Sequence, residues 1–405
     1  MRRVKFYMSE VINFLILLPI YRPPYLTTDK FLFLDPFFTY GKVLAFAAAL
    51  LVFVNNIMGK RFRSNRQTLL GTLLLIAFFG VLLISALVNG NLSDIGAQFL
   101  PIVTLIMLFT VNLQRDIVKW LRPLRFLLFV YALINAVTIL LYPDGLYTQL
   151  VNEYSVRTAK ELWFLGYRNP QIRLLLPALV ISYLCDHIER GRLTGVTYAL
   201  FVLVTFTVLR LHSRTALVGY ILFLVLLYLA MEKDMTIHPR WFLILNAVFF
   251  VFVVLLRMQR YLSFIIVEIL HRDITLSSRD MVWNLALASF IRKPILGPSI
   301  TVYKLAEWYS VTHPHNFMLY VLCKGGLAGF ALLTSFLVIV TRRLQAARDS
   351  AIGKVLLVSF EAFFVMTFVE SLTEGMFFWV LLIMCFDVGE LCRLENTWED
   401  VGISV

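Results

Sequence analysis

Apolar runs of membrane-spanning length recur along the whole chain and constrain its fold more than any other feature. A helix that crosses a bilayer needs about 17–25 mainly apolar residues. About twelve runs qualify on that length, at residues 9–26, 40–58, 68–88, 96–113, 122–142, 170–187, 193–210, 214–231, 240–257, 316–340, 354–371 and 374–391. Hydrophobic residues make up 60% of the 405 positions, against about 45–50% in soluble domains. We therefore predict an all-α, polytopic membrane bundle of about twelve transmembrane helices.

Lysine and arginine concentrate in alternate connections between these runs. The basic segments are the N-terminus and the loops near residues 59–67, 114–125, 189–192, 232–240 and 342–354. Cytoplasmic loops carry such residues, so this side is predicted to be cytoplasmic, with both termini on it. The net charge of +12 is then explained by topology, and nucleic acid is not an expected partner. We expect a multi-pass protein of a plasma membrane.

The two longest connections, residues 143–169 and 258–315, both fall on the opposite, outer side in this topology. The predicted organisation is therefore transmembrane helices 1–9 over residues 1–257, an extracytoplasmic loop over 258–315, and transmembrane helices 10–12 with a short cytoplasmic tail over 316–405. Within the long loop, amphipathic patterning predicts an interfacial helix at 260–272. A second helix is predicted at 277–293, ended by Pro294 and Gly297, and a third short one at 302–310.

Arginines on the predicted outer side are informative because basic residues are otherwise concentrated on the inner side. Arg210 and Arg214 flank a very short turn between two spans, while Arg257, Arg260 and Arg279 belong to the long loop or its border. The planar guanidinium matches phosphate and pyrophosphate with two parallel hydrogen bonds. The alternative for any one of them is an arginine that reaches the lipid headgroups. As a set they indicate a site for a lipid-linked phosphate or pyrophosphate.

His313, His315 and Asn316 stand where the long loop re-enters the membrane. Histidine suits proton transfer near neutral pH, although Asn316 also has the character of a helix cap. No third metal ligand lies at useful spacing in the sequence, and no acidic pair suggests bound magnesium. No metal or other cofactor is therefore expected.

Lys324 and Glu361 are charged residues inside two predicted consecutive spans. Lys324 lies about 13 Å below His315, and Glu361 about 15 Å below Ser371, at 1.5 Å per helical residue. Charges within a membrane normally pair, so a structural ion pair between Lys324 and Glu361 is predicted. A proton relay through the same two residues is the alternative.

A spaced set of residues runs through the second half of the chain: Ser213 and Arg214; Ser277, Arg279 and Trp283; Pro294 and Gly297; His315 and Asn316; and Gly326, Leu327 and Gly329. Together these residues resemble the pattern of the O-antigen polymerase and O-antigen ligase superfamily of bacterial envelope glycosyltransferases. The resemblance covers about 120 residues. The chain departs from the pattern after Pro294, where Gly-x-Gly is often present, and at Lys324, where an acidic or polar residue is common.

The resemblance implies a metal-independent, inverting glycosyl transfer at the outer leaflet. The donor would be an oligosaccharide linked to undecaprenyl diphosphate, which leaves as an acceptor hydroxyl attacks the anomeric carbon. Arg214 and Arg279 would stabilise the departing diphosphate, and His315 would act as general base. Further diphosphate-binding candidates are Arg210, Arg257, Arg260, His313 and Asn316.

Three functions remain open at this point. The resemblance favours a polymerase that joins repeat units of an O-antigen, capsule or exopolysaccharide in a bacterial inner membrane, with a chain-length regulator as a further candidate partner. The first alternative is an O-antigen ligase, which moves a finished chain to lipid A-core or another acceptor. The second alternative is a polysaccharide transporter or flippase, whose site would lie nearer the bilayer midplane.

Overall fold

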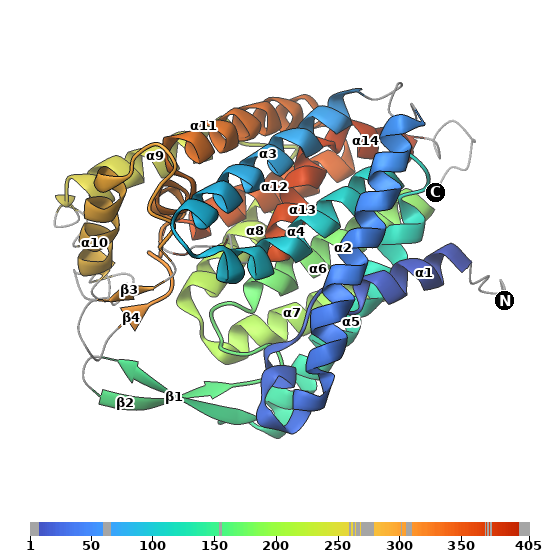
Figure 1. Ribbon diagram of the computed structural model, residues 1–405. Helices are drawn as coiled ribbons and strands as arrows, with labels where there is room; N and C mark the ends of the chain where they lie inside the picture. Colours follow the sequence, from blue (N-terminus) through green and yellow to red (C-terminus); the bar gives the residue numbers. More distant parts are fainter. Residues whose placement is uncertain are drawn as a thin grey trace.

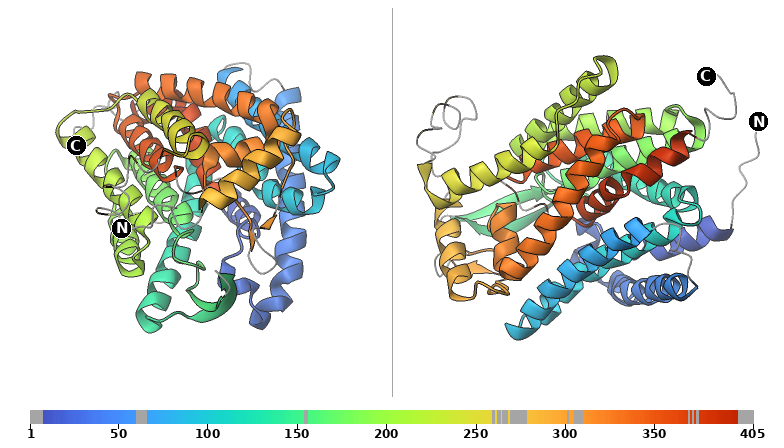
Figure 2. Two further views of the ribbon diagram at one scale, coloured as in Figure 1. Left: turned by 90° about the vertical axis from the view of Figure 1, so that its left-hand side faces the viewer. Right: turned by 90° about the horizontal axis from the view of Figure 1, so that it is seen from above.

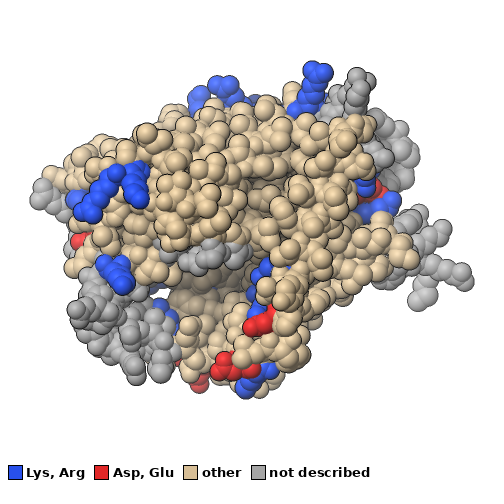
Figure 3. Space-filling view, in the orientation of Figure 1, with Lys and Arg blue, Asp and Glu red and all other residues tan. Residues whose placement is uncertain are grey.

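The computed structural model consists almost entirely of helices that lie side by side, most of them along one common direction (Figure 1). It describes residues 8–59, 66–153, 156–258, 261, 264, 268, 279–300, 302–304, 310–368, 370, 372 and 375–396. Much of the face drawn in Figure 3 carries no charged side chain, as expected for a surface that lies in lipid. The predicted all-α membrane bundle is confirmed.

Every apolar run predicted as a span contains a helix. The N-terminal half contains α1 (Met8–Leu17), the 3-10 helices η1 (Pro24–Thr27) and η2 (Asp29–Leu34), α2 (Asp35–Met58), α3 (Arg66–Val88), α4 (Leu92–Leu113), α5 (Val118–Leu141) and α6 (Ile172–Arg190). The C-terminal half contains α7 (Gly195–Leu211), α8 (Arg214–Glu232), α9 (Arg240–Phe249) with the π-helix η4 (Phe250–Leu255), α10 (Arg279–Arg292), α11 (Phe317–Ala346), α12 (Ala351–Met366), α13 (Met376–Phe386) and α14 (Val388–Asn396).

Among the described residues, five helical segments are long and apolar enough to cross a membrane by length and composition. They are η2 with α2, α3, α5, α8 and α11. The other apolar helices are shorter. In particular, α1 ends at Leu17, because the chain turns before Pro23 and Pro24 instead of continuing to residue 26 as predicted. The number of spans therefore stays a prediction.

Two segments predicted to share one side of the membrane do lie at one end of the molecule. Figures 1 and 2 place α10 and a β-hairpin at that end, and α1 and α14 at the other. The hairpin was not predicted: β1 (Tyr147–Glu153) pairs antiparallel with β2 (Val156–Leu162), and Tyr147 lies opposite Leu162. The pattern of apolar residues along the sequence does not distinguish this short β-hairpin from a loop.

The long loop matches its prediction in part. The helix predicted at 277–293 is confirmed as α10. The interfacial helix predicted at 260–272 lies outside the described residues, apart from isolated positions. The third helix, predicted at 302–310, is not formed at the two ends of that range, where β3 (Tyr303–Lys304) pairs antiparallel with β4 (Ser310–Val311); residues 305–309 lie outside the described residues. Tyr303 is 1% exposed and packs in a cluster with Val282 and Trp283, which favours an extended segment there.

Helix α11 is broken at Gly326, which has φ 59° and ψ −159°. The backbone of residues 294–299 docks against the break. Leu327 N donates to Pro294 O (2.8 Å), Ala328 N to Ile295 O (3.1 Å), and Ser299 N to Cys323 O (2.8 Å). Backbone groups that a helix would pair internally are thus paired with protein, as an apolar surrounding requires. This contact explains why the sequence combines Pro294 and Gly297 with Gly326.

The predicted ion pair between Lys324 and Glu361 is not formed. Lys324 Nζ lies 5.9 Å from the ring centre of Tyr320, and both carboxylate oxygens of Glu361 are buried with no hydrogen-bond partner among the described residues. The prediction assumed that helices consecutive in sequence pack together. Instead, α11 lies mainly against α3 and α12 mainly against α8.

Candidate functional site

The segment His313–Asn316 is held in place from three directions. Trp283 Nε1, on α10, donates to Pro314 O at 2.9 Å. Asn316 caps α11, since its Oδ1 accepts from Leu319 N at 3.0 Å, and its Nδ2 donates to Phe368 O at 3.2 Å in the connection between α12 and α13. His315 itself has φ 52°, a conformation that costs energy for any residue but glycine. A strained, tightly held histidine is typical of a functional site.

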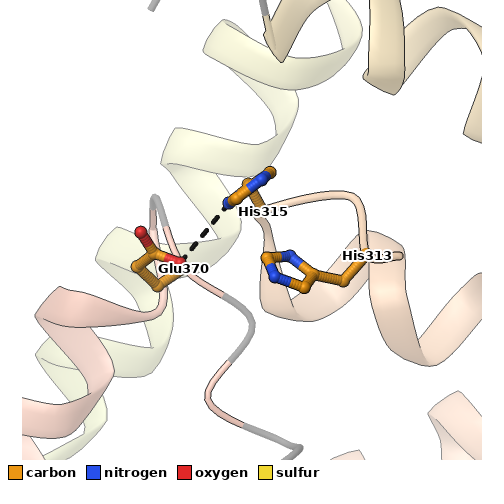
Figure 4. A group of neighbouring side chains, drawn as sticks. All are labelled: His313, His315 and Glu370. Carbon is orange, nitrogen blue, oxygen red and sulfur yellow. Dashed lines mark hydrogen bonds and ion pairs between the residues drawn. The ribbon is translucent and has the colours of Figure 1, made fainter. Parts of the chain in front are cut away.

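Glu370 is the residue around which the site gathers. His315 Nδ1 lies 3.4 Å from Glu370 Oε2, and Figure 4 shows the two side chains directed toward each other with His313 beside them. Arg279 Nη2 lies 3.4 Å from the other carboxylate oxygen, Oε1. Arg279 and Trp283 are four residues apart on α10, so one face of this helix contacts both Glu370 and the histidine segment.

A second arginine reaches the site from α6. Gly375, just before α13, sits so close to Arg173 that a Cβ added at the glycine would lie 2.9 Å from Arg173 Cβ. The positive charge of Arg173 also acts on Glu370 and on His313. The cluster formed by Arg173, Arg279, His315 and Glu370 therefore carries more positive than negative charge, which suits a multiply charged anion.

Electrostatics set the ionisation of two groups in the site. Burial alone would raise the pKa of Glu370, but the hydrogen bond and charge of His315, with the charges of Arg279 and Arg173, lower its pKa to about 2. Burial lowers the pKa of His313 well below its ordinary value, and the charges of His315 and Arg173 lower it further. Glu370 is thus a carboxylate, and His313 a neutral imidazole, at physiological pH.

Acid is expected to destabilise the protein through both groups. Each has a lower pKa when folded, so the unfolded chain binds more protons and stability falls as pH falls. For Glu370 the loss falls between pH 4.5 and about 2 and reaches about 3 kcal/mol. Thermal unfolding of purified Glu370→Gln protein in detergent should depend less on pH than wild type below pH 4.5. Identical pH profiles for the two proteins would contradict this assignment.

His313, His315 and Glu370 also meet the geometric requirement for a metal site. One ligand atom from each lies within 4.8 Å of the others, so the structure supplies a third ligand that sequence spacing did not reveal. Two guanidiniums act on the same carboxylate, however, and their charge opposes a divalent cation. The arrangement fits an anion better than a metal ion.

The structure assigns the other predicted site residues to different places. Arg257 stacks over Trp283 and donates to Asp280 O (3.2 Å) and to the side chain of Asn284, so it supports α10. Asn316 caps α11 and donates to Phe368 O, and its predicted contact with the substrate stays a prediction. Arg214 begins α8 and is exposed, and Arg210 lines a separate cavity. Arg260 lies outside the described residues.

Sequence reasoning missed Glu370 and Arg173. Glu370 is far from the histidines in sequence, and its predicted position was inside a span that ends at residue 371. Glu370 could have been found from its depth, because it lies at the predicted outer end of one span, at the same level as the histidines that begin another. Arg173 could have been found in the same way, because it lies near the predicted outer end of residues 170–187.

Replacing Trp283 with phenylalanine should impair the site while leaving its other residues in place. The change removes the bond from Trp283 Nε1 to Pro314 O while keeping an aromatic ring under Arg257. We expect a loss of about 1–2 kcal/mol in stability. On the activity that the family resemblance implies, we expect at least about a tenfold loss, because a small displacement of a group at a functional site is costly. Thermal unfolding and the surface polysaccharide expected from that resemblance would be measured beside Trp241→Phe, a residue that is 54% exposed. Equal activity of the two variants would contradict this role.

The geometry can now be compared with known proteins. A family model described as O-antigen ligase matches residues 199–334. The matched third of the chain runs from α7 to the middle of α11 and contains Arg214, Arg279 and both histidines of the site. No curated protein matches the chain. The resemblance to the O-antigen polymerase and ligase superfamily is thus confirmed over this segment, and with the apolar helices it supports a membrane enzyme of the O-antigen ligase or polymerase type. Glu370 and Arg173 lie outside the O-antigen ligase match.

Proposed function

We propose that this chain is an inner-membrane glycosyltransferase that polymerises undecaprenyl-diphosphate-linked oligosaccharide repeat units at the outer leaflet. The observation that carries the proposal is the convergence of Arg279, Arg173 and His315 on Glu370. Arg279 begins α10, which lies at one end of the molecule (Figure 1). An imidazole next to an excess of guanidinium charge has the two chemical capacities that such a transfer requires: proton acceptance and stabilisation of a leaving diphosphate.

His315 would act as general base through Nε2. A carboxylate can only accept, so the contact with Glu370 Oε2 assigns the proton of the neutral imidazole to Nδ1 and leaves Nε2 as the acceptor. The acceptor oxygen forms a bond to the anomeric carbon, its proton passes to Nε2, and the bond from that carbon to the diphosphate breaks. Undecaprenyl diphosphate leaves with the electron pair. A single displacement inverts the anomeric configuration.

Arg279 would bind the diphosphate while it contacts Glu370. A guanidinium presents five N–H donors in a planar fork, so one edge can contact a carboxylate and another a phosphate. Arg173 adds charge to the same place, and Arg214, at the exposed start of α8, is proposed to contact the same group. Their effect is greatest on the transition state, where negative charge develops on the leaving oxygen.

The principal alternative is an O-antigen ligase, which would use the same chemistry and is equally compatible with the family match. The transporter hypothesis loses its main support, because Lys324 and Glu361 do not pair. The broken helix α11 could suggest a transport site, but the backbone of residues 294–299 occupies the break.

Purified protein in liposomes, given a labelled lipid-linked repeat unit, tests the proposal. A polymerase produces a ladder of longer lipid-linked chains and releases undecaprenyl diphosphate in the presence of EDTA. Transfer only after addition of lipid A-core would establish the ligase instead. Unchanged donor under both conditions, with folded protein, would overturn the proposed chemistry, and activity abolished by EDTA would overturn its metal independence.

A further inference from the structure

A cavity of about 210 Å³ lies at the base of the β-hairpin, where strand β2 ends. The turn that follows α5, strand β2, the segment before α6 and the turn between α7 and α8 all contribute to it. Its lining residues are Pro143, Asp144, Glu161, Trp163, Arg168, Arg210, Leu211 and His212. The part of the chain matched by the family model contributes only the last three of these.

The walls of the cavity are built by specific contacts. Trp163 is 4% exposed and donates through Nε1 to Tyr142 O at 2.8 Å, while its ring packs with Ile139 and Leu211. Gly145, at φ 101°, brings the turn so close to β2 that an added Cβ would lie 3.0 Å from Glu161 Cβ. His212 has φ 50°, a strained conformation for a residue other than glycine. This framework brings Asp144 and Glu161 into the lining of the same cavity.

The charges of the cavity balance, unlike those of the cluster around Glu370. Asp144 and Glu161 oppose Arg168 and Arg210, so the four formal charges sum to zero. A diphosphate would gain little from such a site. Carboxylates that accept and guanidiniums that donate, side by side, instead suit the hydroxyl groups of a sugar. The volume is below the roughly 300–1,000 Å³ of pockets for drug-sized ligands, so it fits about one sugar ring.

Two short segments of chain connect the cavity to the proposed active site. Leu211 and His212 directly precede Ser213 and Arg214, and Ser213 Oγ donates to Asn169 Oδ1 at 2.9 Å. Asn169 follows Arg168 of the cavity and precedes, by four residues, Arg173 of the proposed active site. A saccharide in the cavity would therefore lie within a few residues, along the chain, of Arg214 and Arg173. The face drawn in Figure 3 is hollowed below its centre, with both basic and acidic side chains at the borders of the hollow.

From this arrangement we infer that the cavity binds one neutral, hydroxylated sugar unit of the glycosyl acceptor. The inference rests on the proposed function for the identity of the ligand as an acceptor, but not for the binding itself. Asp144 and Glu161 accept hydrogen bonds from its hydroxyls, and Arg168 and Arg210 donate to its oxygens. The cavity would hold the acceptor so that its attacking hydroxyl reaches His315, while the donor diphosphate lies on the arginines.

The test compares sugar binding with donor turnover in the full-length protein. The probe is the oligosaccharide released by mild acid from the host cell's own lipid-linked repeat unit. Its affinity is measured by calorimetry for wild type, Asp144→Asn, Glu161→Gln and the control Asp29→Asn, which removes an exposed carboxylate outside the cavity. Slow transfer of the lipid-linked donor to water is measured in parallel, because it reports the chemistry without an acceptor.

We expect Asp144→Asn and Glu161→Gln each to weaken sugar binding about tenfold, with unchanged donor hydrolysis and no effect of Asp29→Asn. Wild-type sugar binding without any donor turnover would overturn the proposed function and leave the sugar site standing. Unchanged sugar affinity in both cavity variants would overturn the site even if transfer is observed. Displacement of the sugar by phosphatidylethanolamine vesicles, with the same loss in the variants, would identify the cavity as a lipid-headgroup site and overturn the inference.

Discussion

Replacing His315 with glutamine is expected to lower glycosyl transfer by roughly 100-fold to 10,000-fold, the usual contribution of a general base. Glutamine preserves much of the shape and can still contact Glu370, so folding should be retained. What is lost is the nitrogen that accepts the proton of the attacking hydroxyl. The measurement is the initial rate of chain extension from a labelled lipid-linked repeat unit, in liposomes with equal amounts of folded protein.

His238→Gln is the matched control, because His238 lies between α8 and α9, outside the site. Glu370→Gln should also reduce the rate, since it removes the negative charge that fixes His315 Nδ1 as the donor, and an amide can equally donate to Nδ1. Residues that act as a unit have non-additive effects, so the double change of His315 and Glu370 should be scarcely slower than His315→Gln alone. Fully additive losses would show that Glu370 acts independently of the imidazole, and a rate near wild type in His315→Gln would remove the general base from the mechanism.

Replacing Gly326 with alanine is expected to cost at least about 3 kcal/mol and to reduce the yield of folded protein sharply. Gly326 has φ 59° and ψ −159°, a backbone region that essentially only glycine adopts. A Cβ there would also lie 2.3 Å from Ile295 O and 2.5 Å from Gly297 N. Both atoms belong to a backbone that is hydrogen-bonded to α11, so neither can move without breaking that contact.

Gly80→Ala is the control for this experiment, because it lies within α3 and an added Cβ there would meet no atom within 4 Å. Alanine is the better helix former, so the control should be neutral or slightly stabilising. The readouts are the monodisperse peak in detergent and the midpoint of thermal unfolding. If Gly326→Ala behaved like the control, the docking of residues 294–299 against α11 would be wrong.

The helices could be predicted because their cause is local. A run of apolar residues such as 68–88 has to form a helix in lipid whatever surrounds it, since its backbone groups find no other partners. The helix α10 could also be predicted from the apolar run and from Pro294 after it. The β-hairpin and the strand pair at Tyr303 could not, because they depend on how distant segments pack rather than on a repeating pattern.

The proposed active site could likewise be predicted only in part. Arg279 and His315 could be picked out as residues of suitable chemistry on the predicted outer side, while Glu370 and Arg173 join the site only through contacts across the bundle. The predicted ion pair within the membrane was wrong for the same reason. Depth along a helix can be counted from sequence, but which helices adjoin cannot, so Lys324 and Glu361 were paired although α11 and α12 pack mainly against other helices.

From the sequence alone, it was determined that this chain is a helical membrane protein with arginines and histidines gathered near the long loop, because bilayer insertion depends on local composition and loop charge. Only the tertiary structure decided that Glu370 joins Arg279 to His315, that α11 breaks where the backbone around Gly297 docks, and that a charge-balanced cavity forms where strand β2 ends. Each of these depends on atoms that are far apart along the chain, and their proximity is set by which surfaces pack most closely.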